Sequence, residues 1–96
     1  MEKDILQQYA GIYEVSIKKL IHRLIINVED EKIYVEDPDA TDRLPKLRLY
    51  AESRNKFIIK EVTALKFEFV ADEVNHSIKL ITYNSRGKDS EWRKIN

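Results

Sequence analysis

Strict alternation of apolar and polar residues runs through most of this sequence and constrains its fold more than any other feature. In the segment LKFEFVA (65–71), Leu65, Phe67 and Phe69 fall on one side, and Lys66 and Glu68 fall on the other. Because successive side chains of a strand point to opposite faces, a period of two is typical of a β-strand with one buried face. The sequence therefore predicts strands that each bury one side.

The same alternation recurs along the chain, with short polar turns between the segments. The other expected strands are GIYEVSI, HRLIINVE, KIYVE, KLRLYAE, KFIIKEV, IKLITY and SEWRKI, which begin at residues 11, 22, 32, 46, 56, 78 and 90. In the first of them the alternation places Tyr13, Val15 and Ile17 inward and Lys18 outward. The longest connection is DPDATDRLP (37–45), and no crossover helix separates any two of these segments. Antiparallel hairpins are thus favoured over a parallel sheet.

A meander of strands must protect its two edges, and closure into a barrel removes both. We predict an all-β fold, an antiparallel up-and-down barrel of about eight short strands with an interior mostly filled by side chains. Before the first strand, KDILQQY indicates a short helix over about residues 3–9, because Asp4 can cap it and Leu6 and Tyr9 share one side. The whole chain, residues 1–96, is expected to form a single domain.

Composition excludes several classes of function. The 17 basic and 17 acidic residues cancel, and no basic cluster appears, which argues against a nucleic-acid-binding protein. Without cysteine there is no disulfide framework and no thiolate site. No segment has the apolar length of a signal peptide or a membrane span, so the chain as written is expected in the cytoplasm. If it is cut from a longer protein, a secreted or periplasmic location stays open.

Three serines precede a lysine by three positions, in the manner of the S-x-x-K nucleophile motif: Ser16–Lys19, Ser53–Lys56 and Ser85–Lys88. That chemistry needs both side chains on one helical face, whereas residues three apart on a strand point to opposite faces. The first pair lies in a strand pattern and the others in expected turns. We predict no catalytic residue among them, and no enzymatic activity.

Metal and cofactor sites are not expected either. His22 and His76 are the only histidines, and they lie in different segments. The carboxylates of Asp37, Asp39 and Asp42 resemble a calcium loop, but Asp42 and Arg48 stand where that loop needs glycine and glutamate. Asn75-His76-Ser77 is a formal glycosylation sequon. We interpret these residues as ordinary turn and surface positions.

Tyr34 and Tyr50 alternate with inward-facing neighbours and are therefore expected on the outside of their strands. Exposed tyrosines among charged residues are weak indicators of a contact surface. The other aromatic residues fall on the apolar sides of their strands, where a place in the core is the default.

Several short motifs, taken together, resemble one known family. They are YAGIYEV after an expected helix, IxVEDxKIYV (26–35), LxLYAxSxxxF (47–57), LKFEFV before a turn, and a closing WRKI. The chain is similar to the lipocalin-like β-barrel domain at the C-terminus of many bacterial serine hydrolases related to β-lactamases and penicillin-binding proteins. The residues that carry the likeness are Tyr9, Gly11, Tyr13, Phe57, Phe67, Phe69 and Trp92.

The family motif implies that Gly11 allows a sharp helix-to-strand junction and that Tyr9 and Tyr13 pack below it as a plug. The sequence departs from the family at DEVNHS (72–77), where the family has a glycine turn, and at Ala51, where it has proline. The family's hydrolase domain is absent from these residues, so no catalytic residue carries over.

The resemblance implies a non-catalytic accessory or interaction domain, without cofactor. Its partner would be a hydrolase domain in the same or another chain, or a second copy through self-association. The alternative is a free-standing barrel that holds a small apolar ligand in its mouth, as lipocalins do. A filled interior favours the first interpretation, and a cavity that reaches the rim favours the second.

Overall fold

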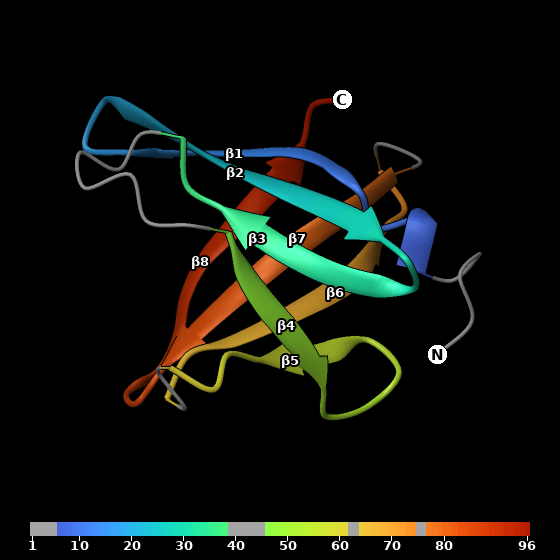
Figure 1. Cartoon of the computed structure of the whole chain (residues 1–96). Helices are drawn as coiled ribbons and strands as arrows, with labels where there is room; N and C mark the ends of the chain where they lie inside the picture. Colours follow the sequence, from blue (N-terminus) through green and yellow to red (C-terminus); the bar gives the residue numbers. More distant parts are fainter. Residues whose placement is uncertain (1–5, 39–45, 62–63, 75–76) are drawn as a thin grey trace.

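The computed structural model describes residues 6–38, 46–61, 64–74 and 77–96, with the backbone alone for Asp72. Within these ranges the chain forms eight strands (Figure 1). They are β1 (Gly11–Ile17), β2 (Leu20–Glu29), β3 (Lys32–Glu36), β4 (Leu47–Ala51), β5 (Lys56–Ile58), β6 (Lys66–Asp72), β7 (Ser77–Asn84) and β8 (Gly87–Lys94). The all-β prediction is confirmed.

Each strand pairs antiparallel with its neighbours in sequence, and β1 pairs with β8 to close the barrel. The predicted up-and-down meander is therefore confirmed. Closure rests on few residues, since Tyr13 pairs with Lys94 and Glu14 pairs with Arg93. Successive connections lie at alternate ends of the barrel (Figure 1). One end carries the connections β1–β2, β3–β4, β5–β6 and β7–β8, and the turn before β1 lies at the other end.

The core consists mostly of side chains that the alternation predicts to point inward, together with Leu6 and Tyr9 from the turn before β1, whereas Ile17, also predicted inward, is exposed. Its buried members are Leu6, Tyr9, Tyr13, Ile26, Ile33, Val35, Leu49, Phe57, Ile59, Phe67, Phe69 and Leu80. Cross-strand partners such as Ile26 and Val35, or Phe57 and Phe67, share the inner face and pack against each other. The pattern of period two thus fixed which face of each strand is buried.

Aromatic side chains fill the end of the barrel where β1 begins. The ring of Tyr9 stacks on Phe69 with centroids 4.4 Å apart, and Phe57 meets Phe69 edge to face at 5.7 Å. The hydroxyl of Tyr13 donates a hydrogen bond of 2.8 Å to the carbonyl oxygen of Tyr9, so its polar group is satisfied inside the core. Tyr9 and Tyr13 are therefore both buried at this end of the barrel and pack with Phe57 and Phe69.

Gly11 makes the junction at this end of the barrel possible. Its φ of +149° is strained for any residue with a side chain, and a Cβ there would lie 2.3 Å from the carbonyl oxygen of Asn96. That same oxygen accepts a hydrogen bond of 3.2 Å from the N–H of Ile12. The glycine therefore permits both a positive φ and a close backbone approach at the seam of the barrel.

Of the expected helix at residues 3–9, the first three residues lie outside the described ranges. Residues 6–9 form a turn, in which the N–H of Tyr9 donates to the carbonyl of Leu6 at 2.9 Å. A helix over the full span stays a prediction. No helix among the described residues has the length and apolar character needed to span a bilayer.

Two of the predicted strand boundaries are wrong at the β1–β2 hairpin. Lys18, expected to face outward in a strand, lies with Lys19 in a two-residue turn, and β2 begins at Leu20 rather than at His22. Both lysines have positive φ, 51° and 71°. A two-residue hairpin turn needs positive φ angles to match the twist of its strands. The continuous pairing of β1 with β2 holds Lys18 and Lys19 at these angles.

The strands β5 and β8 also differ in length from the prediction. β5 ends at Ile58, although the predicted strand KFIIKEV extends to residue 62, and β8 begins at Gly87 rather than at Ser90. Gly87 has a φ of +111°, which ends the tight turn, and the register shift between Thr82 and Tyr83 leaves an extra residue in β8. Trp92 is partly buried, and its Nε1–H donates to the hydroxyl of Thr82 at 3.1 Å.

Candidate functional site

The three Ser–Lys pairs lie on strands and turns. Ser16 is exposed on β1 opposite Ile21, and Lys19 belongs to the turn that follows. Ser53–Lys56 spans the β4–β5 connection, where the N–H of the serine donates to the carbonyl of the lysine at 3.2 Å. Ser85–Lys88 spans the β7–β8 turn. None of the three pairs therefore has the single-helix geometry of an S-x-x-K nucleophile.

The histidines and aspartates are equally scattered where the structure describes them. His22 lies on β2 opposite Val15 and is half-buried, and Asp37 follows β3 at the rim of the barrel. His76, Asp39 and Asp42 lie outside the described residues, as does Asn75 of the sequon. Across the described ranges, no three His, Asp or Glu side chains come together as metal ligands.

A pocket of about 220 Å³ opens at the end of the barrel that carries the β3–β4 and β5–β6 connections. We call it the mouth pocket. Its lining is apolar apart from one carboxylate and consists of Leu24, Val35, Leu47, Ile59, Leu65, Phe67 and Asp37. The interior is therefore less completely filled at this end, where mostly aliphatic side chains line the space, than at the opposite end, where aromatic rings fill it.

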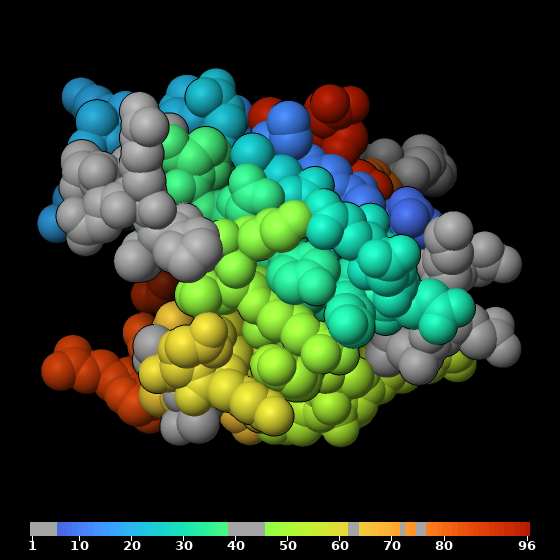
Figure 2. Space-filling model, in the orientation of Figure 1, coloured from blue at the N-terminus to red at the C-terminus, as the bar shows by residue number. Residues whose placement is uncertain are grey.

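The β1–β2 hairpin at the same end exposes three large apolar side chains. Ile17, Leu20 and Ile21 are 41%, 65% and 55% exposed, and we call them the apolar arm. Ile17 and Leu20 are cross-strand partners on the side of the hairpin that continues the inner face of the barrel. Figure 2 shows the hairpin (blue) at the margin of the molecule. Such a cluster is unusual on a surface and indicates a contact site.

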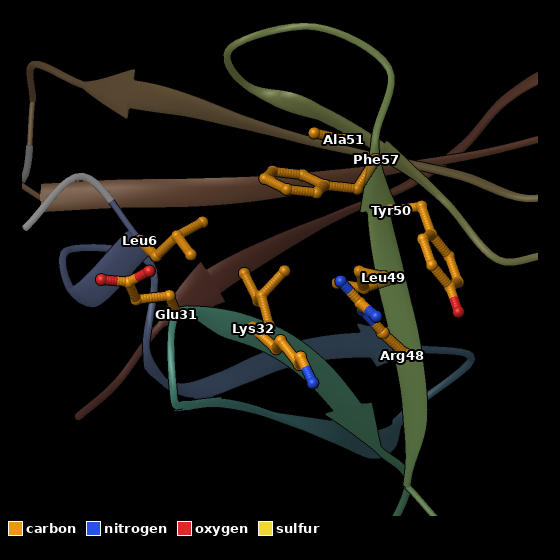
Figure 3. Close-up of a pocket in the computed structure, with 9 residues that line it drawn as sticks. Leu6, Glu31, Lys32, Arg48, Leu49, Tyr50, Ala51 and Phe57 are labelled. Atoms are coloured by element: carbon orange, nitrogen blue, oxygen red, sulfur yellow. The ribbon is translucent and has the colours of Figure 1, made fainter. Parts of the chain in front are cut away.

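A second, smaller pocket of about 120 Å³ lies near the aromatic end, between β3 and β4. Leu6, Ile33, Leu49 and Phe57 contribute apolar side chains, and Glu31, Lys32 and Arg48 add charge. In Figure 3, Tyr50 points away from Leu49, as neighbours on a strand do. The charges border the space from exposed positions, and its volume is about half that of the mouth pocket.

Tyr34 and Tyr50 lie on the outer face, as predicted, and basic side chains cover their rings. Nζ of Lys46 lies 5.0 Å from the ring centre of Tyr34, while the Arg48 guanidinium and Nζ of Lys60 lie 4.6 and 4.3 Å from that of Tyr50. Within this distance a cation is attracted to the ring face. These tyrosines therefore have partners inside the molecule, which weakens the case for them as a bare stacking surface.

Among the described residues, the pKa shifts arise from burial and from local hydrogen bonds. Burial raises the pKa of the Tyr13 phenol, and a hydrogen bond of 2.6 Å to Glu68 raises the pKa of Tyr83. Hydrogen bonds from Lys79 and Lys88 lower the pKa of the Glu91 carboxyl to about 2. Each group thus keeps its ordinary charge near neutral pH.

Sequence reasoning missed both features that stand out at the mouth. The apolar arm had a local signal, because SIKKLIH (16–22) places apolar residues on both sides of a lysine pair that reads equally well as a turn. The mouth pocket had none, since its residues look like any other inward-facing positions. Its volume depends on how five separate segments of the chain come together.

Comparison with known proteins gives no relative: no protein-family model, no curated protein and no solved structure matches this chain. The likeness to the barrel domains of serine hydrolases therefore stays a prediction from the motifs.

Proposed function

We propose that this chain is a non-catalytic binding module and that the mouth pocket receives one apolar group of a protein partner. The observation that carries the proposal is the pocket itself, an apolar space of about 220 Å³ that opens to the surface beside three exposed apolar side chains. A lining of this kind gains free energy by removing an apolar group from water. The predicted association with a hydrolase domain would use the same surface.

The size of the pocket favours an anchoring side chain over a large ligand. Sites for drug-sized molecules usually measure about 300–1,000 Å³, whereas an apolar cavity of about 150 Å³ holds a benzene molecule. A leucine or phenylalanine side chain therefore matches the space, and a lipid does not. A free-standing binder of a small apolar molecule is the second candidate, supported by the same lining and limited by the same volume.

A titration with a minimal probe tests the proposal. We expect N-acetyl-leucine amide to shift the methyl NMR signals of Leu24, Leu47 and Leu65 in a saturable way, with a Kd of about 1 mM, because one buried leucine contributes only a few kcal/mol. The methyl signal of Val74, exposed on the β6–β7 turn at the other end, should not move.

Two substitutions provide a matched comparison. Leu47→Phe places extra volume in the mouth pocket and should abolish the shifts, whereas Val74→Phe adds the same ring at the opposite end and should leave them intact. Shifts spread evenly over the surface, or none at up to tens of millimolar probe, would show that the pocket is not a binding site. Stronger binding of cyclohexanol than of the amino-acid amide would favour the small-ligand candidate.

A further inference from the structure

The proposed function does not identify the protein partner. The exposed apolar side chains of this chain's own β1–β2 hairpin match the mouth pocket of a second molecule. We propose that the partner is a second copy of this chain, and that the apolar arm of each copy inserts into the mouth pocket of the other. This inference rests on the proposed function, because it uses the same pocket. The second-copy inference has three further supports. They are the exposed β1–β2 hairpin, the charges beside the apolar arm and the mouth pocket, and the location of arm and pocket at the same end of the barrel.

The arm extends beyond the closed part of the barrel. β1 pairs with β8 at Tyr13 and Glu14, and no further pair between these strands forms among the described residues. From Val15 onward β1 is therefore held by β2 alone, and its other edge is open. An open edge with Ile17 and Leu20 beside it is a surface that a folded chain normally covers.

The pocket fits what the arm presents. Leu20 is the most exposed member of the arm at 65%, and one leucine side chain fills a large part of about 220 Å³. Ile17 lies directly across the hairpin and offers a second apolar group to the rim. Removal of both from water supplies a free-energy gain that the monomer does not obtain.

The charges around the two surfaces are complementary. Lys18 and Lys19 form the tip of the hairpin next to the arm and are exposed. Among the described residues that line the pocket, Asp37 is the one with a charge. A lysine tip that approaches the Asp37 carboxylate is favoured in encounter and in orientation.

The position of arm and pocket at the same end of the barrel selects the symmetry. Two barrels that face each other mouth to mouth can exchange both arms through one twofold rotation, since each contact is then repeated in reverse. Such an isologous dimer is closed and cannot grow into a polymer.

Sedimentation velocity over a range of concentrations tests the dimer. We expect the wild-type chain to show a reversible monomer–dimer equilibrium, and we expect Leu20→Asp and Leu47→Arg each to raise the dimer Kd about tenfold or more. Val74→Asp is the matched control, because it places the same charge on an exposed apolar residue at the opposite end and should leave the Kd unchanged.

A mixing experiment addresses the arrangement directly. In a mixture of the Leu20→Asp and Leu47→Arg chains, the intact arm of one meets the intact pocket of the other, and the altered pair brings Asp opposite Arg. The mixture should therefore associate more tightly than either variant alone. Equal weakness of the mixture and its components would exclude the exchanged contact.

A measurement on the wild-type chain tests the contact between copies without depending on the folding of any variant. In a sample of mixed labelled and unlabelled chains, isotope-filtered NOEs should join the methyl groups of Leu20 to those of Leu47 or Leu65. A chain that stays monomeric to about 1 mM, or a dimer without these NOEs, overturns the inference.

The probe titration separates this inference from the proposed function. Repeated on Leu20→Asp, whose arm cannot compete, N-acetyl-leucine amide should still shift the signals of the mouth pocket. If it binds while the wild type is monomeric, the pocket is a binding site and only the second-copy partner is wrong. If it does not bind, the proposed function fails.

Discussion

Gly11 is the residue whose replacement should disturb the fold most for its size. Any side chain there is strained by the φ of +149° and also collides with the backbone of Asn96. Gly87 shares only the first problem, since a Cβ at its φ of +111° meets no atom within 4 Å. Comparison of the two glycines therefore separates conformational strain from the close approach at the seam.

We expect Gly11→Ala to lower the free energy of unfolding by about 2–4 kcal/mol and Gly87→Ala by about 1–2 kcal/mol. The extra loss at Gly11 reflects the displaced Asn96 carbonyl and its hydrogen bond to Ile12. Urea denaturation followed by the fluorescence of Trp92 measures both values. Equal losses in the two variants would mean that Asn96 moves aside at no cost.

Glu91 gives the fold a dependence on acid. Its carboxylate accepts hydrogen bonds from Lys79, at 2.8 Å, and from Lys88, and these lower its pKa from an ordinary value of 4.5 to about 2. Since the folded pKa is the lower one, the ionised group stabilises the fold above pH 4.5 and loses that contribution as the pH falls toward 2. Exposure of all three side chains keeps the effect small.

The expected result is a wild-type protein more stable than Glu91→Gln at pH 6 and a difference that vanishes near pH 2. Thermal unfolding at several pH values gives the stability, and carbon NMR of the Glu91 carboxyl gives the titration midpoint. A midpoint near 4.5 would contradict the two lysine contacts.

At the scale of the elements, the two hairpins β1–β2 and β2–β3 turn through residues unsuited to their backbone angles. Asp30 and Glu31 have φ of 50° and 65°, and Lys18 and Lys19 have similar values. Asparagine and glycine favour these angles in two-residue hairpins. The strands on either side must therefore supply the free energy that holds the turns.

Replacement of Asp30-Glu31 by Asn-Gly should accordingly stabilise the fold by about 1 kcal/mol, equivalent to a rise in Tm of several degrees for a domain of this size. Valine at Glu31 is the contrasting variant and should destabilise, because a β-branched residue resists a positive φ. Differential scanning calorimetry compares the three proteins. A lower Tm for the Asn-Gly variant would show that the native side chains make contacts which outweigh the strain.

These turns also show how far the sequence can predict the elements. The inward faces of the strands were predictable because burial of one side requires a period of two, as with Phe67 and Phe69. The turn at Lys18-Lys19 was not, since a lysine pair fits a strand and a turn equally well and its angles are imposed by the pairing of Ile17 with Leu20. The end of β5 at Ile58 was also unpredictable, because the residues that follow it, Ile59 and Lys60, carry no turn signal.

At the scale of the whole molecule, the two ends of the barrel differ in how completely side chains fill them. Tyr9, Tyr13, Phe57 and Phe69 close one end, and aliphatic residues leave the mouth pocket at the other. The sequence predicted which residues point inward, but not how much volume they fill. That volume depends on the tilt and stagger of all eight strands and on the segments that border the rim.

The number of paired residues between neighbouring strands also varies around the barrel. Two seams are short: β4 pairs with β5 at Tyr50 and Ala51, and β1 pairs with β8 at Tyr13 and Glu14, whereas β6 and β7 pair along their full length. Opening of the two short seams would divide the barrel into the halves β1–β4 and β5–β8. We infer that partial unfolding begins there, because fewer cross-strand contacts must break.

A disulfide across the β1–β8 seam tests this inference. Glu14 and Arg93 are direct partners on the outer face, so their Cα atoms lie at a separation that a disulfide can bridge, and the chain has no other cysteine to compete. Glu14→Cys with Arg93→Cys closes a loop of most of the chain and should stabilise the fold by about 3–4 kcal/mol when oxidised. The lost ion pairs of Glu14 are exposed on their arginine side and subtract little.

Hydrogen exchange then locates the effect. The amides of Ile12 and Ile95, which donate hydrogen bonds across the seam, should exchange faster than those of β6 and β7 in the reduced protein, and oxidation should slow their exchange most. If the disulfide raised the Tm without changing the exchange of these amides relative to β6, it would act on the unfolded chain alone, and the seam would not be where opening starts. Addition of a reductant to the same sample restores the starting state and serves as the internal control.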